Sequence, residues 1–413
     1  MISESTINGV TTRVIRDEVE WNAMRPDWDE LFAASQCTSF SLHFEWLTNW
    51  WRTYGAAYAV DGLRIVTVWR DAQCIGAVPL YLGRRTIGPV GVRELRLIST
   101  GEATFEETCP DYINLLCLPG AEAECSEAFW KTVDEMSWDR VFLQGLPEGS
   151  VLLRDSISDG RPCRNEIVRT GVCPVADLSR GFENYLQSLS SKTRRNARRF
   201  MREADRNGAV FELANAANAD QFFEDLIRLH QDRWTSEGKP GCFAAARFTE
   251  FHRRLVRAWI PAGQAVLARL SHEGQVYGVR YGFRFQSTFF EYQLGLKRTD
   301  TGPFHSPGTT SNLLLMRTLA ERGVTSYDFL QGPLSSYKQP FASGENQLVE
   351  FAAWRPSLNG FVYRSVQSTG RAIRKVLRRV KSTENSENTN RTTSESESLG
   401  EQFEGAAPLV QDA

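Results

Sequence analysis

One structural pattern occurs twice in this 413-residue chain, and it constrains the fold more than any single motif. In residues 13–150, amphipathic helical segments precede two strands joined by a short polar turn, a third strand, a helix and a last strand. The same order recurs in residues 173–356. Both copies contain Phe-Leu-Gln-Gly after an aromatic residue and Asp, at 142–145 and 329–332. The repetition predicts a tandem duplication of one α/β unit.

The C-terminal part of the chain differs in composition from the two copies. Residues 361–381 place apolar side chains at helical spacing among Arg and Lys, which predicts a basic amphipathic helix. Either this helix docks on the core with its basic face in solvent, or it lies on an anionic membrane surface. Residues 382–413 carry seven acidic residues against one Arg, and we predict a disordered acidic tail.

The composition excludes several classes of protein. Charged residues make up 24% of the chain, and no apolar run approaches the ~20 residues of a membrane-spanning helix. The first residues lack the features of a secretory signal, so we expect a cytoplasmic protein, peripheral to the inner membrane only through the basic helix. A net charge of −2 favours no partner class, and we expect no binding to DNA. The eight cysteines include no Cys-x-x-Cys pair, so we predict reduced thiols and no metal.

A polar turn between a predicted strand and a predicted helix is the strongest local signal for ligand binding. Pro307 suits the first helical position, and Ser306, Gly308, Thr309 and Thr310 around it are small or carry hydroxyl groups. A helix start presents free N–H groups and the positive end of the helix dipole, so it can bind phosphate. The alternative is an ordinary helix cap.

A second signal is a basic helix near the start of the second copy. Residues 192–206 contain seven Lys and Arg against two acids, and five of the cations share one helical face. Arg194, Arg195 and Arg198 are candidates for binding phosphates of a cofactor, an acidic substrate or RNA. The alternative is a solvated face, although charges of one sign repel each other without a counter-ion.

A third signal surrounds the second Phe-Leu-Gln-Gly. Asp328 and Lys338 lie near the C-terminal end of a predicted strand, where an Asp can act as a base and a Lys or Tyr as a proton donor. His230, at the end of a predicted helix, is a second candidate base. The alternatives are a turn cap, a solvated charge and a core histidine. Further candidates for this site are Tyr337, Gln331, Tyr292, Gln293, Arg233 and Trp234.

The order and spacing of these segments resemble the GNAT acyltransferase superfamily, in its tandem branch related to FemAB-type transferases and the CelD-like proteins of bacterial polysaccharide operons. The similarity covers residues 13–354. In the second copy it is carried by residues 191–199, 230, 233–234, 279–283, 292–295, 306–308, 327–332 and 337–338. In the first copy it is looser and rests on residues 44–46, 76–80 and 111–112.

The resemblance implies an α/β fold of two GNAT-like units, each a mixed, mostly antiparallel sheet flanked by helices, with the second unit catalytic. It implies an acyltransferase for groups other than aminoacyl groups, with acyl-CoA as co-substrate and no metal. The acceptor would be an amine of a small molecule or of a glycan precursor for polysaccharide or cell-envelope synthesis.

The resemblance also implies direct transfer without a covalent enzyme intermediate. Asp328 or His230 would deprotonate the acceptor amine, and backbone N–H groups near the third strand would stabilise the oxyanion. Tyr337 or Lys338 would protonate the leaving thiolate, and the helix start at 306–310 with the basic helix would hold the donor phosphates.

Two other functions stay open. FemAB-type enzymes use aminoacyl-tRNA, and the basic helix fits RNA, but no long charged coiled coil is inserted here, so tRNA is the weaker donor. Alternatively, a non-catalytic component of a polysaccharide biosynthesis complex would work through the basic helix and the acidic tail.

Overall fold

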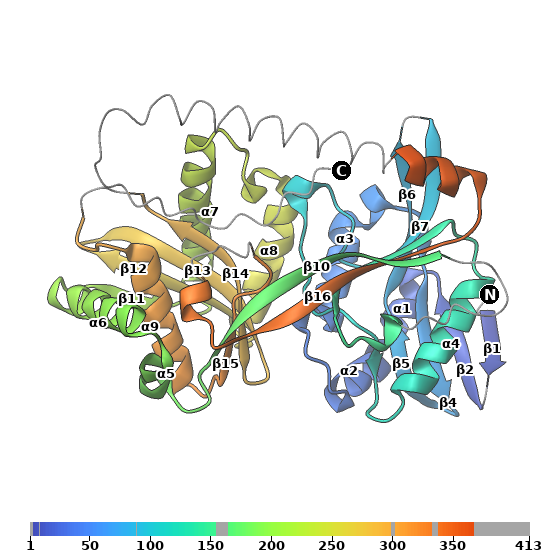
Figure 1. Cartoon of the computed structure of the whole chain (residues 1–413), viewed down its shortest axis with the longest axis horizontal. Helices are drawn as coiled ribbons and strands as arrows, with labels where there is room; N and C mark the ends of the chain where they lie inside the picture. The colour runs from blue at the N-terminus through green and yellow to red at the C-terminus, as the bar shows by residue number, and fades with distance from the viewer. Residues whose placement is uncertain are drawn as a thin grey trace.

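The computed structural model describes residues 3–7, 9–87, 89–153, 164–298, 302–332 and 338–366. Figure 1 shows an N-terminal half in blue and cyan and a C-terminal half in green to orange, joined by two long strands across the middle of the molecule. Residues 358–366 are helical. Tyr337, residues 367–381 of the predicted basic helix and the predicted tail lie outside the described residues.

The N-terminal half divides its strands between two sheets. Its elements are β1 (Ser3–Ile7), β2 (Val10–Ile15), α1 (Glu18–Ala23), α2 (Arg25–Ala34), η1 (Phe40–Leu42), α3 (Phe44–Tyr58), β3 (Ala59–Leu63), β4 (Ile65–Arg70), β5 (Gln73–Val78), β6 (Leu80–Ile87), β7 (Val90–Leu97), η2 (Thr104–Glu106), β8 (Leu116–Cys117), α4 (Glu122–Glu135), β9 (Arg140–Pro147) and η3 (Val151–Leu153). A small sheet has the order β1-β2-β4-β5-β8. Pro79 cannot donate to a ladder, and it separates β5 from β6 where the chain changes sheet. Residues 73–87 therefore form two strands that belong to different sheets.

The C-terminal half contributes most of the large sheet. Its elements are β10 (Arg164–Asp177), α5 (Phe182–Ser188), α6 (Ser191–Arg206), β11 (Val210–Leu213), α7 (Ala219–Ser236), η4 (Cys242–Ala244), α8 (Ala246–Trp259), β12 (Ala265–His272), β13 (Gln275–Phe285), β14 (Thr288–Leu296), α9 (Pro307–Glu321), β15 (Ser326–Asp328), η5 (Gln339–Phe341) and β16 (Gly344–Trp354). The large sheet has the order β11-β12-β13-β14-β15-β10-β16-β9-β7-β6-β3. β10 starts earlier than the expected boundary at 173. None of the helices in the described part of the chain has the length and apolar character that crossing a bilayer requires.

The two halves repeat one arrangement. β7 pairs in parallel with β9 after the intervening helix α4, and β14 pairs in parallel with β15 after α9. The other strand pairs are antiparallel, and the two Phe-Leu-Gln-Gly segments lie on β9 and directly after β15. The expected duplication of a mixed, mostly antiparallel unit flanked by helices is confirmed.

Aromatic side chains join the halves into one core. Trp46 of α3 lies edge-on to Phe251 of α8 with ring centroids 4.8 Å apart, and Phe40 stacks on Phe283 of β13 at 4.5 Å. The Asn49 side chain donates a hydrogen bond of 2.9 Å to the Phe251 carbonyl. Because β16 also pairs with both β9 and β10, packing and hydrogen bonding both hold the halves together.

Candidate active site

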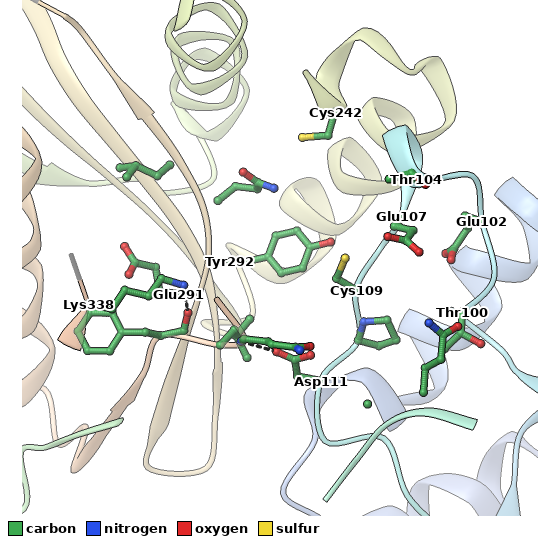
Figure 2. Close-up of a pocket in the computed structure, with 18 of the residues that line it drawn as sticks. Thr100, Glu102, Thr104, Glu107, Cys109, Asp111, Cys242, Glu291, Tyr292 and Lys338 are labelled. Atoms are coloured by element: carbon green, nitrogen blue, oxygen red, sulfur yellow. Dashed lines mark hydrogen bonds between the residues drawn. The ribbon is translucent and has the colours of Figure 1, made fainter. Parts of the chain in front are cut away.

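A cavity of about 180 Å³ opens between the two halves. Figure 2 shows side chains from both halves around this space. One wall comes from the segment 100–111 and the end of β9, and the other from α7, β14 and the residues after β15. The polar and ionisable residues that line it are Thr100, Glu102, Thr104, Glu107, Cys109, Asp111, Gln144, Arg169, His230, Arg233, Trp234, Cys242, Glu291, Tyr292, Gln293, Gln331, Lys338 and Glu350.

Asp111 is the lining carboxylate that bonds directly to the opposite half. Its Oδ2 accepts a hydrogen bond of 2.7 Å from the backbone N–H of Gln331 and a longer one of 3.6 Å from the Cys173 thiol. Burial raises the pKa of Asp111 to about 6, although the bond from Gln331 lowers it. At pH 7 this carboxylate is mostly ionised and can accept a proton.

Lys338 reaches the same cavity from the segment after β15. Its Nζ donates a hydrogen bond of 2.5 Å to the carbonyl of Phe329. Burial lowers the pKa of Lys338 to about 8, and the negative charge of Asp111 partly opposes this shift. The side chain is therefore still an ammonium at neutral pH, with a pKa suited to proton donation.

The segment that carries Asp111 has an uncommon backbone. Ser99, Cys109 and Tyr112 have φ angles of 77°, 42° and 64°, in the left-handed region that side chains other than glycine rarely adopt. Such conformations persist where surrounding contacts hold them, and they gather at functional sites. Here one contact is the hydrogen bond of 2.8 Å from Trp46 Nε1 to Ser99 Oγ.

Glu107 has no hydrogen bond or ion pair with any described residue, and Figure 2 shows its carboxylate near Cys109. Burial, and then the charge of Glu102, raises the pKa of Glu107 to about 7. Desolvation, followed by the charges of Glu107 and Asp111, raises the pKa of Cys109 well above its usual value. This wall therefore offers a hydrogen-bond acceptor but no thiolate nucleophile.

β14 has a β-bulge where it borders the cavity. The register with β13 shifts between Tyr281 and Gly282, which leaves Tyr292 as the extra residue. A Cβ on Gly282 would lie 2.2 Å from the Phe290 carbonyl oxygen, so only glycine fits there. The bulge turns Tyr292 toward the other half, where its hydroxyl donates to the Thr108 carbonyl at 2.6 Å (Figure 2). Gln293, the next residue, also lines the cavity.

A buried ion pair fixes the bulged strand. Arg280 of β13 pairs with Glu291, which lines the cavity, and both side chains are buried. The same guanidinium donates to Ser311 Oγ at 3.0 Å and to the Gly308 carbonyl at 2.5 Å. Arg280 therefore connects β13, β14 and the first turn of α9.

His230, Arg233 and Trp234 lie at the end of α7 and line the cavity. Trp234 Nε1 donates to His230 Nε2 at 2.8 Å, so the His230 proton is on Nδ1, which donates to Gln231 Oε1 at 3.0 Å. Burial lowers the pKa of His230 to about 4. The ring is neutral, and its acceptor nitrogen is already engaged. Arg233 pairs with Glu237 at 3.4 Å.

Asp328 is not among the cavity-lining residues. Its Oδ1 accepts a hydrogen bond of 2.7 Å from the backbone N–H of Leu330, and its Oδ2 accepts one from the Tyr112 hydroxyl. Burial raises the pKa of Asp328 to about 7. The carboxylate expected to act as base thus connects the two halves, and Asp111 is the more accessible group.

The two Phe-Leu-Gln-Gly segments meet at the cavity through Gln144 and Gln331. Gln331 packs so closely on Gly171 of β10 that a Cβ there would lie 1.9 Å from Gln331 Nε2. Gln144 accepts a hydrogen bond of 2.8 Å from Arg96, which pairs with the buried carboxylate of Glu94. A duplicated motif thus supplies matching side chains to opposite walls.

The predicted phosphate-binding residues lie in the first turn of α9, outside the cavity lining. Ser306 Oγ donates to Thr309 Oγ1 at 2.9 Å. A Cβ on Gly308 would lie 2.9 Å from Leu296, so its backbone packs against the end of β14. The hydroxyl of Thr310 is buried and has no hydrogen-bond partner among the described residues.

The predicted phosphate-binding arginines of α6 do not line the cavity either. Arg194 donates to the carbonyls of Gln187 at 2.7 Å and Leu189 at 3.4 Å, so it caps the end of α5. Arg195 is exposed and Arg198 is half-buried, and neither forms an ion pair within the described residues. Of the three, Arg195 and Arg198 are available to a ligand.

Sequence reasoning gave no site role to Asp111, Glu107, Cys109 or Gln144. Asp111 was visible only as part of the looser similarity of the first copy, and Gln144 only as part of the repeated tetrapeptide. Within the described residues, no group of three His, Cys, Asp or Glu side chains could hold a metal ion.

Comparisons with known proteins give the following likenesses. Residues 191–339 match the model of a GNAT acetyltransferase domain. The solved structure of FemX aligns with 83% of this chain and 98% of its own chain, at 13% identity and a TM-score of 0.57. L-PGS from Bacillus licheniformis aligns at 12% identity over 81% of this chain and 93% of its own, with a TM-score of 0.48. A tandem GNAT protein from the clavulanic acid biosynthesis pathway aligns at 12% identity over 84% and 99%, with a TM-score of 0.41. No curated protein matches this sequence.

Proposed function

We propose that this chain is an N-acyltransferase acting by direct transfer, because residues 191–339 match the model of a GNAT acetyltransferase domain and the fold is similar to that of FemX. The observation that carries the proposal is that Asp111 and Lys338 line the same cavity, beside the β14 bulge. Their pKa values of about 6 and about 8 leave an ionised acid and an ionised amine together at pH 7.

The proposed reaction needs no enzyme-bound intermediate. Asp111 accepts a proton from the acceptor amine as its nitrogen attacks the donor carbonyl carbon. Backbone N–H groups at the bulged residues Tyr292 and Gln293 stabilise the oxyanion, because a bulge takes a residue out of the ladder. The bond from the carbonyl carbon to the leaving sulfur or oxygen breaks, and Lys338 protonates the leaving atom. Tyr337 stays a predicted proton donor, outside the described residues.

We propose acyl-CoA as the donor, held by the start of α9. The N–H groups of its first turn suit a phosphate, and the buried Thr310 hydroxyl beside them has no hydrogen-bond partner among the described residues. β14 connects the first turn of α9 to the cavity in which transfer is proposed, since Leu294 lines this cavity and Leu296 contacts Gly308. Arg195 and Arg198 are the cations that would bind the phosphates of the donor.

An amine-bearing acceptor suits the N-terminal wall of the cavity. Glu107 lines this wall and forms no hydrogen bond or ion pair with another described residue. A carboxylate that lacks a cation favours a ligand that brings one. We propose a glycan precursor of polysaccharide or cell-envelope synthesis as the acceptor, as the CelD-like resemblance implies.

The test is transfer of an acyl group from acetyl-CoA or a long-chain acyl-CoA to a panel of amino sugars. Release of free thiol and the mass of the product would be measured. We expect Asp111→Asn and Lys338→Met to lower kcat/KM by about 10²–10⁴-fold, the usual contribution of a general acid or base. Asp328→Asn is the matched control, expected to lose less than about tenfold because Asp328 does not line the cavity. Equal loss in Asp111→Asn and Asp328→Asn would contradict the assignment.

A second possible donor is the aminoacyl-tRNA that the FemAB-type resemblance of the sequence implies. The same acceptor panel with charged tRNA would separate the two donors. Activity that requires tRNA and disappears after RNase treatment would replace acyl-CoA as the donor.

A further inference from the structure

Two irregularities of the large sheet lie next to each other where β10, β16 and β9 border the cavity. Figure 1 shows β10 and β16 crossing the middle of the molecule. The register between β10 and β16 shifts between Ile167 and Arg169, and the register between β16 and β9 shifts at Glu350. The first shift makes Arg169 the cross-strand partner of Glu350, so the two side chains lie on the same face of the sheet. Both residues line the cavity.

Arg169 differs from the other cations of the cavity lining. It is half-buried, and it forms no hydrogen bond or ion pair through its side chain with another residue in the part of the chain that the structure describes. By contrast, Arg233 pairs with Glu237, and Lys338 donates to the Phe329 carbonyl. A guanidinium can bind a carboxylate or a phosphate through two parallel hydrogen bonds. Arg169 is therefore suited to bind an anionic group of a ligand in the cavity.

The position of Arg169 points to the acceptor rather than to the donor. The proposed site for the donor phosphates, at the start of α9, lies outside the cavity lining, whereas the acceptor amine is proposed to meet Asp111 inside the cavity. A ligand that is only anionic would be repelled, because Glu107, Asp111 and Glu350 line the same cavity. A ligand that carries both an amine and an acid matches these carboxylates and Arg169 together.

We propose that the acceptor carries an acidic group, a phosphate or a carboxylate, in addition to its reactive amine, and that Arg169 binds this acidic group. The inference rests on the proposed function, because it names the class of acceptor for the same cavity. Ionic contacts at both ends of the acceptor orient its nitrogen for attack on the donor carbonyl. Arg169 is then a specificity-determining residue, since a neutral amino sugar lacks the group that it binds.

The test is isothermal titration calorimetry of the full chain with glucosamine, glucosamine 6-phosphate, glucosaminuronic acid and glucose 6-phosphate. Calorimetry needs no acyl donor, so it measures acceptor binding independently of transfer. We expect glucosamine 6-phosphate or glucosaminuronic acid to bind at least about tenfold more tightly than glucosamine, which lacks the acid. The same compound should bind more tightly than glucose 6-phosphate, which lacks the amine. Whichever of the two binds more tightly identifies the acid as a phosphate or a carboxylate.

Three variants test the role of Arg169 in this preference. Arg169→Met should remove the preference for the acidic amino sugar over glucosamine. Arg169→Lys keeps the charge without the two parallel donors, so it should retain part of the preference. Arg180→Met is the matched control, because Arg180 is exposed and lies outside the cavity lining, and it should bind like the unaltered chain. An unchanged thermal midpoint shows that each variant folds.

Equal affinity of the unaltered chain for glucosamine and for both acidic amino sugars overturns the inference, as does a preference that persists in Arg169→Met. In the transfer assay, Arg169→Met should raise the KM for the acidic acceptor. A rise in the KM for the donor instead would assign Arg169 to the donor and overturn the inference.

Failure of this inference differs from failure of the proposed function. Transfer to glucosamine that is as efficient as transfer to either acidic amino sugar leaves the proposed function intact and overturns only the role of Arg169. Absence of transfer to every acceptor overturns the proposed function, and the calorimetric preference still decides what Arg169 binds.

Discussion

At the scale of single residues, burial alone does not distinguish a catalytic carboxylate from a structural one. Asp111 and Asp328 are both buried, both have a raised pKa, and both accept a backbone N–H. They differ in access, because Asp111 lines the cavity and Asp328 is bonded to Tyr112. A perturbed pKa marks a candidate, and geometry has to choose between candidates.

The pair of Asp111 and Lys338 predicts the pH dependence of the transfer reaction. Asp111 must be ionised, so kcat/KM should rise with pH through about 6. Lys338 must be protonated, so kcat/KM should fall as pH increases through about 8. A pH profile of the purified chain checks both limbs. If the residual activity of Asp111→Asn keeps the acidic limb, another group is the base.

The buried ion pairs of Glu94 predict how the stability of the folded chain depends on pH. Although burial raises its pKa, Arg96, Arg140 and Arg85 outweigh burial and hold the pKa of Glu94 near 2 in the folded chain. A folded pKa of about 2 against about 4.5 unfolded corresponds to about 3 kcal/mol of stability. Because the pKa is depressed, this stability is present above pH 4.5 and is lost as pH falls toward 2.

Glu94→Gln should therefore lower the free energy of unfolding at pH 7 by about 3–5 kcal/mol, since Arg96 and Arg140 would remain buried without their carboxylate. Urea unfolding across pH 3–7 is the measurement. The deficit should shrink in acid, and a deficit that is constant across this range would show that Glu94 does not titrate as described.

At the scale of elements, β14 and α9 act as one unit through Arg280. This guanidinium joins Glu291 on the bulged strand to the Gly308 carbonyl in the first turn of the helix. The cavity and the proposed donor site are therefore mechanically connected.

Arg280→Met should destabilise the chain by about 3–5 kcal/mol because it leaves Glu291 buried without a cation. It should also raise the KM for the donor, since the first turn of α9 loses its link. Arg284→Met on the same strand is the control, with an expected loss below about 1 kcal/mol. Chemical denaturation measures the loss of stability, and steady-state kinetics measures the KM for the donor. Equal effects of Arg280→Met and Arg284→Met on both quantities would contradict the proposed role of Arg280.

At the scale of the whole molecule, β16 and the aromatic cluster make the two halves interdependent. β16 pairs with β9 of one half and β10, and Trp46, Phe251, Phe40 and Phe283 interlock across the boundary. A unit that stood alone would lose an edge of its sheet and part of its core.

We therefore expect a single cooperative unfolding transition, with tryptophan fluorescence and far-ultraviolet circular dichroism changing together. Trp46→Ala should lower the free energy of unfolding by about 3–5 kcal/mol and keep one transition. Two resolved transitions in the unaltered chain would mean that the halves fold separately.

Much of the architecture was predictable because it follows local patterns. In the first half, for example, α4 (Glu122–Glu135) is the helix predicted before the last strand, and β9 (Arg140–Pro147) is that strand. Lys338 and Tyr292, two of the candidates chosen from the sequence, line the cavity. The site residues of the first copy could not be predicted in the same way. Asp111 lies in a loop of uncommon backbone, and the loop has no hydrophobic periodicity from which its structure could be predicted.

What the sequence determined by itself is the repetition and the order of elements, because hydrophobic periodicity, turn residues and a doubled tetrapeptide are local properties of the chain. Only the tertiary structure decided which groups share a site. Asp111 and Lys338 are more than two hundred positions apart, and the cavity that joins them exists because β16 returns from the C-terminal half to pair with β9. Burial and access are properties of that assembled surface, so the choice between Asp111 and Asp328 could be made only after folding.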